Sequence, residues 1–522
     1  SICDGDCKTL ANKINVFFQS VSSDLPQLDK SILPPLDVST PVPDQYIISV
    51  GTVEKQLMNI NIRKAIGPDG IPSWILHDFP GFLAPPVAAI FNSSIREGCL
   101  PSLWKTAIAC PVPKVNPPKT LEKDLRPISL TCVLSKELES HPVNWLWRIV
   151  LPQMDPYQFG AMANVSTVHA LIKMCHDWFE STDKASDKNY IHAVLVDYSK
   201  AFDRIHPNIL MEKIMKLENI PPFLLHWIAD FLSNRSQQVK IGNIFSEKID
   251  IWGTVPQGTK LGVLLFLLMI DDLKTSVPTF KYVDDTTIYK ISNDPNDQEL
   301  QVAMNHLHDW SCTNHMKLNT TKTKEMLISF SKDPPTVPNI CVNGKPLERV
   351  NCVKLLGVYI SSDLSWNNHI EYVIKKANCR MFCLNLLRRA KVPSKDILLI
   401  FKSRIRPILE YAAPLWHGGL TQELCDNIEE LQIRACKIAL PEMSYQDALD
   451  FMSLKTLSER RKDMCYNLFV KMEYPQDKLH CILPEKNLPS IITRNQKDYP
   501  LPKCSTNRYK NSFLPYVLFN CQ

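Results

Sequence analysis

Two adjacent carboxylates, Asp284 and Asp285, interrupt residues 281–290, a stretch that otherwise favours β-strand. Asp is poor in strand interiors and two buried like charges repel, so the pair is costly unless something accommodates it. A turn removes the conformational cost. A divalent cation removes the electrostatic cost as well, because Mg²⁺ takes hard oxygen ligands. Taken alone, the pair fits a solvated hairpin tip and a metal site equally well.

A third carboxylate, Asp197, directly follows the continuous apolar run at residues 191–196. Carboxylates at strand ends lie at a sheet edge, where ligands commonly bind, so Asp197 is the natural partner of the acidic pair. Asp203 lies beyond the strand end and is better explained as capping or orienting the next helix. Residues 271–272 are a second Asp pair, but they follow a long apolar helical pattern, so we assign them to a helix end or loop, with metal binding as a poor second.

Cations dominate residues 375–406, where Asp396 is the one anion. Such an imbalance on helical segments predicts a surface for nucleic-acid phosphates, with a merely soluble helical bundle as the alternative.

The 522 residues suggest several domains, and the 39 prolines against 15 glycines suggest many stiff connections. The net charge of +5 is small, and no apolar run is long enough to span a bilayer, so we expect no membrane association. The 17 cysteines are scattered and no secretory signal is seen, which favours a reducing compartment, cytoplasmic and nuclear. We expect nearly all of the cysteines to be buried as small apolar residues. Because the chain starts at Ser1, we expect it to be a piece of something longer.

Local patterns predict helices over residues 7–21, 168–179 and 299–310, and an apolar helix ending before residue 271. Strands are predicted over residues 106–112, 125–130, 191–196, 325–330 and 353–360.

Short motifs in a fixed order, from about residue 60 to 440, resemble those of reverse transcriptases, and most closely the non-LTR (LINE-type, jockey-like) retrotransposon enzymes. The matching segments are GPDGIP at 67–72, LRPISL at 125–130, QFG at 158–160, DYSKAFDR at 197–204, VPQGTKLG at 255–262, YVDD at 282–285, LNTTKT at 318–323 and LLGV at 355–358. Each motif alone is weak, whereas all of them in order are specific.

The resemblance implies an α+β right-hand polymerase with fingers, a palm made of an antiparallel sheet backed by helices, and a helical thumb. The domains it suggests are an N-terminal extension at 1–100, fingers and palm at 101–335, primer grip and basic thumb at 336–440, and a C-terminal region of unknown role at 441–522.

The implied activity is that of an RNA-directed DNA polymerase, which extends a DNA primer on an RNA template with dNTPs. By resemblance, Asp197, Asp284 and Asp285 hold two Mg²⁺ ions, with Mn²⁺ as an alternative, and Asp285 is the less certain ligand. Lys322 resembles the lysine that protonates pyrophosphate.

Further roles carried over by resemblance concern the nucleotide and the nucleic acid. The nucleotide-binding residues are Arg126, Tyr198, Phe202, Gln257 and Gly258, where Phe202 resembles the aromatic gate that excludes a ribose 2′-hydroxyl. The primer-grip residues are Leu356 and Gly357, and the nucleic-acid-binding residues of the thumb are Lys375, Lys376, Arg380, Arg388, Arg389 and Lys395.

Residues 161–165, AMANV, depart from the basic, glycine-containing segment that the family usually has there. A catalytically weak or inactive nucleic-acid-binding remnant is therefore the rival hypothesis. A two-metal nuclease is a third, but it leaves VPQGTKLG and the basic helices unexplained. The endonuclease domain expected upstream in such elements is not seen and would be a partner.

Overall fold

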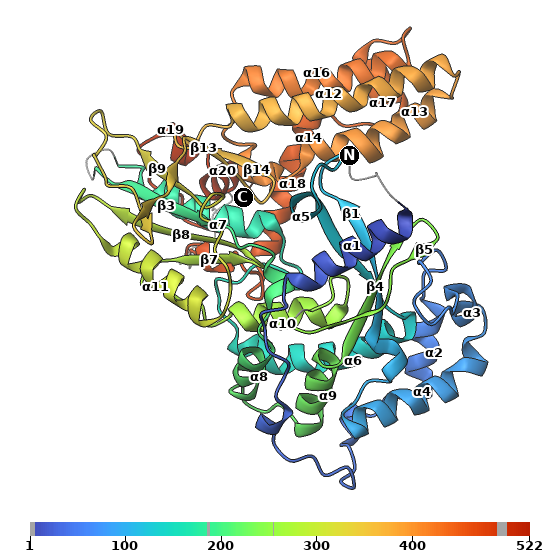
Figure 1. Cartoon of the computed structure of the whole chain (residues 1–522). Helices are drawn as coiled ribbons and strands as arrows, with labels where there is room; N and C mark the ends of the chain where they lie inside the picture. Colours follow the sequence, from blue (N-terminus) through green and yellow to red (C-terminus); the bar gives the residue numbers. More distant parts are fainter. Residues whose placement is uncertain (1–5, 185–187, 254, 488–497, 522) are drawn as a thin grey trace. The chain divides into compact units, whose positions relative to one another are not determined.

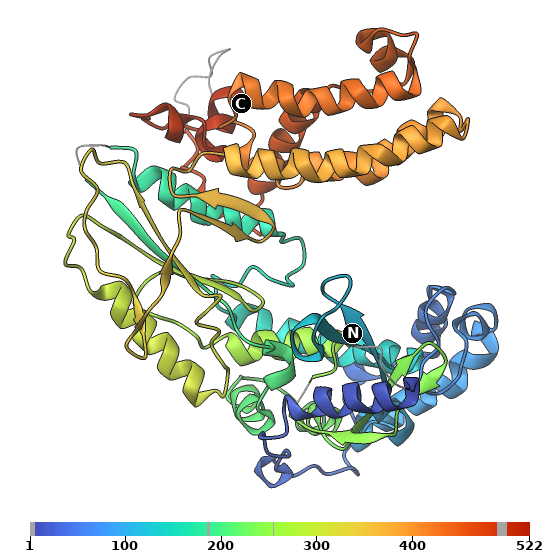
Figure 2. The ribbon, with the colours of Figure 1, turned by 45° about the horizontal axis from the view of Figure 1, so that its top comes forward.

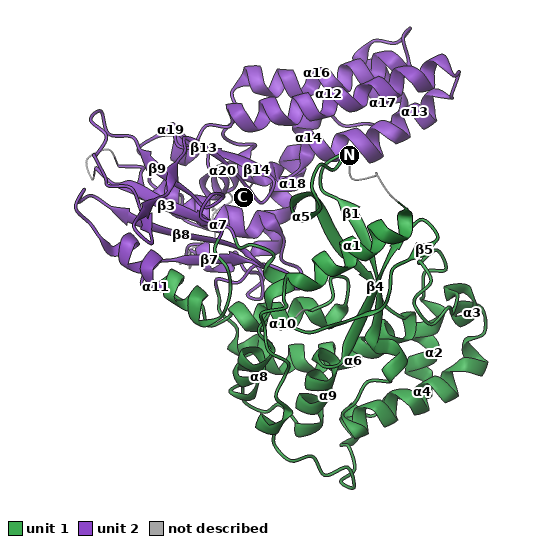
Figure 3. Cartoon of the chain, in the orientation of Figure 1, with its two compact units in different colours: residues 1–156, 198–274, 307–318 green, residues 157–197, 275–306, 319–522 purple. Residues whose placement is uncertain are grey.

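Two compact units, each assembled from three segments of the chain, make up the structure (Figure 3). It is a computed structural model and describes residues 6–184, 188–253, 255–487 and 498–521. Unit 1 contains residues 1–156, 198–274 and 307–318, and unit 2 contains residues 157–197, 275–306 and 319–522. The chain passes from unit 2 to unit 1 between Asp197 and Tyr198.

A small mixed sheet lies at the centre of unit 1. Strand β1 (Thr106–Pro113) pairs antiparallel with β2 (Leu125–Leu130) and parallel with β4 (Arg235–Ile241). The short strands β5 (Ile244–Phe245) and β6 (Ile249–Ile251) pair with β4. Apolar residues of the first helix, α1 (Cys7–Ser20), pack against this sheet, so the start of the chain is part of the unit's core.

Helices surround the sheet of unit 1 (Figure 1). The most apolar is α10 (Lys260–Ile270), which is buried along nearly its whole length. The other helices are α2 (Val50–Met58), α3 (Ser73–Asp78), α4 (Pro80–Glu97), α5 (Leu121–Asp124), α6 (Val133–Val150), α8 (Pro207–Met215) and α9 (Pro222–Leu232). The last turns of α11 (Glu299–Thr313) also belong to this unit.

Unit 2 is built on a sheet with strand order β12-β9-β3-β8-β7. Its strands are β3 (Tyr190–Val196), β7 (Thr279–Tyr282), β8 (Asp285–Ser292), β9 (Lys324–Ser329) and β12 (Glu348–Arg349). All pairs are antiparallel except β12 with β9. Strand β3 is central and buried throughout, which explains its continuous rather than alternating apolar sequence.

Helix α7 (Thr167–Ser181) contributes apolar side chains to the core that includes this sheet. A helical region follows the strands of the sheet in the chain. The helices are α12 (Asn367–Arg389), α13 (Ser394–Ile400), a π-helical turn Phe401–Ile405, α14 (Arg406–Glu410), α15 (Ala413–Trp416), α16 (Gln422–Ala439), α17 (Tyr445–Phe451), α18 (Leu457–Met472), α19 (Asn507–Lys510) and α20 (Phe513–Asn520). Figures 1 and 2 both show α12 and α16 running side by side.

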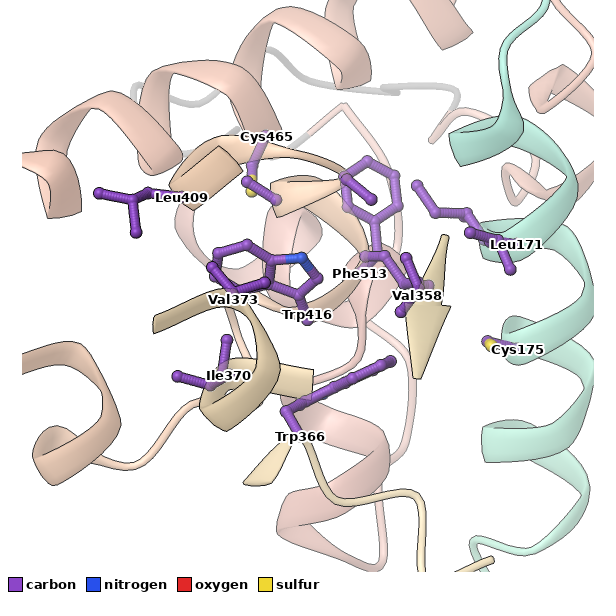
Figure 4. Close-up of a cluster of buried hydrophobic side chains, with 14 of the residues drawn as sticks. Leu171, Cys175, Val358, Trp366, Ile370, Val373, Leu409, Trp416, Cys465 and Phe513 are labelled. Atoms are coloured by element: carbon purple, nitrogen blue, oxygen red, sulfur yellow. The ribbon is translucent and has the colours of Figure 1, made fainter. Parts of the chain in front are cut away.

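One continuous hydrophobic core joins the distant parts of unit 2. Figure 4 shows Phe513 of the C-terminal helix close to Trp416, with Leu171 of α7 on its other side. Two small hairpins complete the unit, β10 (Cys341–Val342) with β11 (Lys345–Pro346) and β13 (Cys352–Leu355) with β14 (Val358–Ser361).

The α+β fold class and the predicted helices are confirmed, but two expectations are wrong. Residues 353–360 do not form one strand, because the chain reverses at Leu356 and Gly357, whose φ angles are +46° and +86°. Most described cysteines are not buried. Only Cys132, Cys175, Cys436 and Cys465 are, since the others lie at exposed or half-buried positions of helices, strands and loops. Among the described residues, no helix is both long and apolar enough to cross a membrane.

Candidate active site

The three candidate carboxylates meet at one edge of the unit 2 sheet. Strand β3 pairs with β8 so that Val196 faces Thr286, which places the next residue, Asp197, beside Asp285. Strands β7 and β8 are joined by a two-residue turn, with Tyr282 facing Asp285 and the turn formed by Val283 and Asp284. Strand register therefore brings Asp197, Asp284 and Asp285 to one edge of the sheet, which their positions in the sequence only suggested.

A neighbouring loop holds the β7–β8 turn in place. Val283 has a left-handed φ of +60°, which is unusual for a β-branched residue. The Gln158 side-chain oxygen accepts hydrogen bonds from the backbone N–H groups of Val283 (3.2 Å) and Gly160 (2.8 Å). A Cβ on Gly160 would lie 2.3 Å from the Val283 nitrogen, so only glycine fits. The sequence motif 158–160 thus supports the acidic turn.

Negative charge accumulates at this edge. Partial burial of its carboxyl group, then the charges of Asp284 and Asp197, raise the pKa of Asp285 to about 6, although the residue as a whole is exposed to solvent. The Oδ2 atom of Asp197 is buried and accepts no hydrogen bond. The Nζ atom of Lys322 lies 3.8 Å from that oxygen, and the Lys322 side chain is 69% exposed.

This donor set fits a divalent cation in its chemistry. It consists of carboxylate oxygens, which are hard ligands. The Asp197 Oδ2 atom is buried without a hydrogen-bond donor, and the pKa of the neighbouring Asp285 is raised. The side chains are not assembled into a complete metal site, because no three His, Cys, Asp or Glu residues converge in that way within the described chain. A cation would therefore have to draw the side chains together.

The segment around Lys322 is tied directly to Asp197. The backbone N–H of Asn319 donates to the Asp197 carbonyl (2.8 Å), and the Asp197 N–H donates to the Thr323 hydroxyl (3.2 Å). Thr323 is a supporting residue to which the sequence reasoning gave no role. Its only signal was its place in the motif LNTTKT.

The predicted primer-grip residues, Leu356 and Gly357, form the turn of the β13–β14 hairpin. Tyr411 donates a hydrogen bond from its hydroxyl to the Leu356 carbonyl (2.7 Å). This hydrogen bond uses the single proton of the Tyr411 hydroxyl. In the 2.9 Å contact between Tyr411 and Thr167, the Thr167 hydroxyl is therefore the donor and the Tyr411 oxygen the acceptor. Tyr411 thereby links this turn to the start of α7, a role with no signal in the sequence.

Most of the predicted nucleotide-binding residues lie close together within unit 1. The Ser129 N–H, on β2, donates to the Gln257 carbonyl (2.9 Å), and a Cβ on Gly258 would lie 3.0 Å from the Ser129 carbonyl oxygen. Arg126 is an exposed residue of the same strand. The glycine-containing turn is thus packed against the strand that carries the predicted triphosphate-binding arginine.

Phe202 and Tyr198 follow Asp197 in the chain but differ in exposure. Phe202 is half-buried and stacks on Phe266, with ring centroids 4.5 Å apart. Tyr198 is only 6% exposed, and burial raises the pKa of its phenol.

The expectation for Asp203 is wrong in detail. His206 rather than Asp203 caps the next helix, because its ring nitrogen accepts from the Ile209 N–H. The Gln257 side-chain amide instead donates to Asp203 (2.9 Å), and burial raises the pKa of this carboxyl.

The predicted thumb cations have different surroundings. Arg388 donates to the carbonyls of Ile438 (2.9 Å) and Ala439 (3.1 Å) at the C-terminal end of α16. Lys375 lies in a groove that also contains Glu371 and Glu430. Arg380 donates to the Arg404 carbonyl (3.1 Å), and Lys376, Arg389 and Lys395 are exposed.

The second Asp pair is structural, as predicted. Asp272 forms an ion pair with Lys213 (2.6 Å) and accepts from the Trp310 indole (3.0 Å). Asp271 accepts from the Asp155 N–H (2.9 Å). Both residues therefore link the C-terminal end of α10 to neighbouring segments of unit 1.

Residues 112–360 match the family model for reverse transcriptase (RNA-dependent DNA polymerase). This segment, which contains the acidic edge and the turns around it, is similar in sequence to reverse transcriptases. Its relatives are the polymerases of non-LTR retrotransposons, which confirms the resemblance stated from the motifs.

Among the relatives are two polymerases of Drosophila melanogaster transposable elements. The chain is 26% identical to the probable RNA-directed DNA polymerase from transposon BS, over 78% of this chain and 46% of that protein. It is 24% identical to the RNA-directed DNA polymerase from mobile element jockey, over 83% of this chain and 49% of that protein. The chain thus spans about half the length of these relatives.

Among solved structures, a telomerase from Candida albicans in complex with a telomeric RNA fragment is 12% identical, covering 69% of this chain and 66% of that one. The TM-score is 0.36, which does not establish a shared fold.

Proposed function

We propose that this chain is an RNA-directed DNA polymerase of a non-LTR retrotransposon. It would transfer a nucleotidyl group from a dNTP to the 3′-hydroxyl of a primer paired with an RNA template. The observation that carries the proposal is the register that sets Asp197 beside Asp285 at the β7–β8 turn, within a segment that is similar in sequence to reverse transcriptases.

Asp197, Asp284 and Asp285 would hold two Mg²⁺ ions, or Mn²⁺ in their place. When bound, such ions supply charge stabilisation at the triphosphate and activation of the primer hydroxyl. The protein's part is to keep the Asp197 oxygen free of competing donors and to fix the acidic turn through Gln158.

Lys322 is the group proposed to give a proton to the leaving pyrophosphate. Its ammonium group is exposed and 3.8 Å from Asp197, so it lies within reach of the acidic edge.

On unit 1, the exposed guanidinium of Arg126 would bind the triphosphate, because a guanidinium forms paired hydrogen bonds with phosphate oxygens. Phe202, held by its stacking on Phe266, would exclude the ribose 2′-hydroxyl. Gln257 and Gly258 would support the nucleotide and template. The buried side chain of Tyr198 would fix the position of the chain between Asp197 and Phe202.

The template and primer would be held by the Leu356–Gly357 turn and by the cations of α12 and α13. The endonuclease of the same element is proposed as a partner, in line with the length by which the relatives exceed this chain.

One observation favours the rival, an inactive nucleic-acid-binding remnant. Ala161 and Asn164, in the segment that departs from the family, have φ angles of +56° and +61°. Glycine adopts such angles without strain, whereas alanine does not. The departure therefore carries a conformational cost beside the motif that supports the acidic turn.

Primer extension on poly(rA)/oligo(dT) with dTTP and Mg²⁺ distinguishes the two. Wild type should incorporate dTTP, and Asp284→Asn should reduce the rate at least about a hundredfold while binding the hybrid as tightly. If wild type incorporates no more than Asp284→Asn yet binds the hybrid, the polymerase proposal fails and the remnant is favoured.

A further inference from the structure

Glu139, in helix α6 of unit 1, is a carboxylate with no exposed surface. A glutamate is almost never fully buried unless hydrogen bonds or an opposite charge compensate it. None of the reverse-transcriptase motifs contains Glu139. Its burial therefore requires partners, and these partners show what the residue does.

The main partners of Glu139 are the first backbone N–H groups of α10, which lies beside α6 (Figure 1). Its Oε2 atom accepts from the N–H groups of Lys260 (2.9 Å) and Leu261 (3.4 Å), and its Oε1 atom accepts from the Ser135 hydroxyl (3.4 Å). The N-cap residue of α10, Thr259, makes no capping hydrogen bond with its side chain. A carboxylate from another helix thus takes the place of the cap, where an anion is also favoured by the helix dipole.

A buried arginine, Arg235 at the start of β4, compensates the charge of Glu139. Arg235 is 2% exposed and donates from Nη1 to the Phe231 carbonyl (3.0 Å), while its Nε and Nη2 atoms have no hydrogen-bond partner among the described residues. Burial raises the pKa of Glu139, whereas the Arg235 charge and the two backbone hydrogen bonds lower it. Arg235 therefore favours the ionised form of Glu139, which is the stronger acceptor.

The turn that leads into α10 carries two of the predicted nucleotide-binding residues, Gln257 and Gly258. Gly258 has a φ of +115° and is followed by a single residue before the helix begins. In the first turn of α10, a Cβ on Gly262 would lie 2.5 Å from the Val255 side chain, so the turn is folded back onto the helix. Because the connection is this short, a shift of the helix start would displace Gly258.

We propose that Glu139 is a positioning residue for the incoming nucleotide. By holding the start of α10, it fixes the Gln257–Gly258 turn against β2, the strand that carries Arg126. Glu139 itself touches no substrate and acts through the backbone of α10. The inference rests on the proposed function for its nucleotide, but nucleotide binding requires no catalysis.

The same helix supplies a matched control. Glu137 also contacts Lys260, but through the side-chain ammonium group (3.3 Å) rather than the backbone. A change at Glu137 therefore removes a buried carboxylate of α6 beside the same residue and leaves the first N–H groups of α10 with their acceptor.

The test uses the full chain with Mg²⁺ and an RNA–DNA hybrid whose primer ends in a dideoxynucleotide, so that dTTP can bind without being incorporated. The measurements are the Kd of dTTP, the Kd of the hybrid, the melting temperature and hydrogen exchange of the peptide 255–262. Glu139→Met keeps the size of the side chain and removes both oxygens. It should weaken dTTP binding about tenfold or more, the factor that one hydrogen bond to a charged group contributes.

In Glu139→Met, exchange at Lys260 and Leu261 should become faster, whereas hybrid binding should be unchanged. Glu139→Gln keeps one oxygen acceptor without the charge and should weaken dTTP binding less, about threefold. Glu137→Met should match wild type in dTTP binding and in exchange of this peptide. This graded order is not expected if Glu139 only stabilises the fold.

The inference is overturned if Glu139→Met folds and binds dTTP as wild type does. It is also overturned if dTTP and hybrid binding weaken together, with a lower melting temperature, in Glu139→Met and Glu137→Met alike. If Glu139→Met does not fold, wild-type exchange and dTTP binding in Glu139→Gln overturn it. If the graded order is found but wild type incorporates no dTTP on an ordinary primer, the positioning role stands and the polymerase proposal fails.

Discussion

The position of Phe202 shows how a single side chain can be both packed and placed for recognition. Its ring stacks on Phe266 of the buried helix α10, and it remains half-exposed in a short helical turn after Asp197. A rigid ring in such a position can exclude a substituent by size alone, because moving it would cost the stacking contact.

Phe202→Val should therefore raise the ratio of ribonucleotide to deoxyribonucleotide incorporation, by roughly one to two orders of magnitude if the ring contributes about 1 to 3 kcal/mol of discrimination. Competing rates for UTP and dTTP on the poly(rA) template measure it. Phe266→Leu is the companion variant: it keeps the Phe202 ring but weakens the stacking that holds it, so it should raise the ratio less than Phe202→Val does. Unchanged discrimination in Phe202→Val would remove the gate assignment.

At this scale the sequence predicted the chemistry but not its support. Asp197, Asp284 and Asp285 were predicted from their types and places, and strand register brings them to one edge. Gln158 and Thr323 hold that edge by bonds to backbone groups far away in the sequence. Such bonds depend on the assembled fold, so no local pattern reveals them.

Among the elements, the β13–β14 hairpin is the one whose shape the sequence concealed. Alternating apolar residues continue through residues 353–360, as in one strand. The reversal rests on Gly357 and on a left-handed Leu356, which ordinary strand propensity does not indicate. The ring of Tyr411 then packs 3.0 Å from where a Gly357 Cβ would be.

Tyr411→Phe should raise the KM for primer-template about two- to tenfold with kcat nearly unchanged. The variant loses the hydrogen bonds that position the hairpin turn, each worth about 0.5 to 1.5 kcal/mol, but keeps the ring. Steady-state kinetics with varied primer-template measure this. Tyr474→Phe, an exposed tyrosine 56% open to solvent, is the control. If kcat fell by as large a factor as KM rose, and the melting temperature also fell, the variant would have a general folding defect instead.

The first turn of α12 should make unit 2 sensitive to acid. His369 is 1% exposed, and burial with the nearby Lys354 charge lowers its pKa to about 4 from an ordinary 6.5. The unfolded chain binds the proton more readily than the folded one, so stability falls as the pH falls from about 6.5 to about 4. The whole shift corresponds to about 3 kcal/mol.

Denaturant unfolding of wild type and His369→Asn at pH 7 and pH 4.5 tests this. Asn retains an acceptor for the Tyr359 N–H but does not titrate in this range. The variant should lose less stability between the two pH values than wild type does. Equal losses would show that His369 does not contribute to the acid sensitivity.

For the whole molecule, the main finding is that the C-terminal region is part of the core of unit 2. No role could be predicted from the sequence for residues 441–522. Tyr509 is buried, and Arg508 donates to the Thr182 carbonyl (2.7 Å) with its guanidinium over Phe330. Such contacts join segments hundreds of residues apart, so periodicity within either segment could not predict them.

Asp183 anchors the C-terminal segment to the end of α7. Its carboxylate accepts from the Ser505 N–H (2.7 Å), the Thr506 N–H (2.9 Å) and the Thr506 hydroxyl (2.7 Å). Burial alone would raise the pKa of Asp183, but these hydrogen bonds lower it.

Asp183→Asn should destabilise the protein by about 1 to 3 kcal/mol, because an amide N–H₂ would face a backbone donor. Urea unfolding measures the change, and limited proteolysis should cut the C-terminal segment sooner. Asp498→Asn, at an exposed position, is the control. A variant as stable as wild type would mean that the apolar contacts of α20 alone hold the segment.

The same anchor has a consequence for how the protein is made. Asp183 and Thr506 are 323 residues apart, so at about 5 to 20 residues per second a ribosome needs roughly 15 to 65 s to travel from one to the other. Throughout that time, the apolar face of α7 lacks the side chains of α20 that cover it. The nascent chain must therefore be kept from aggregating for most of its synthesis, and a message interrupted before residue 505 would yield a protein in which this face of α7 lacks its cover from α20.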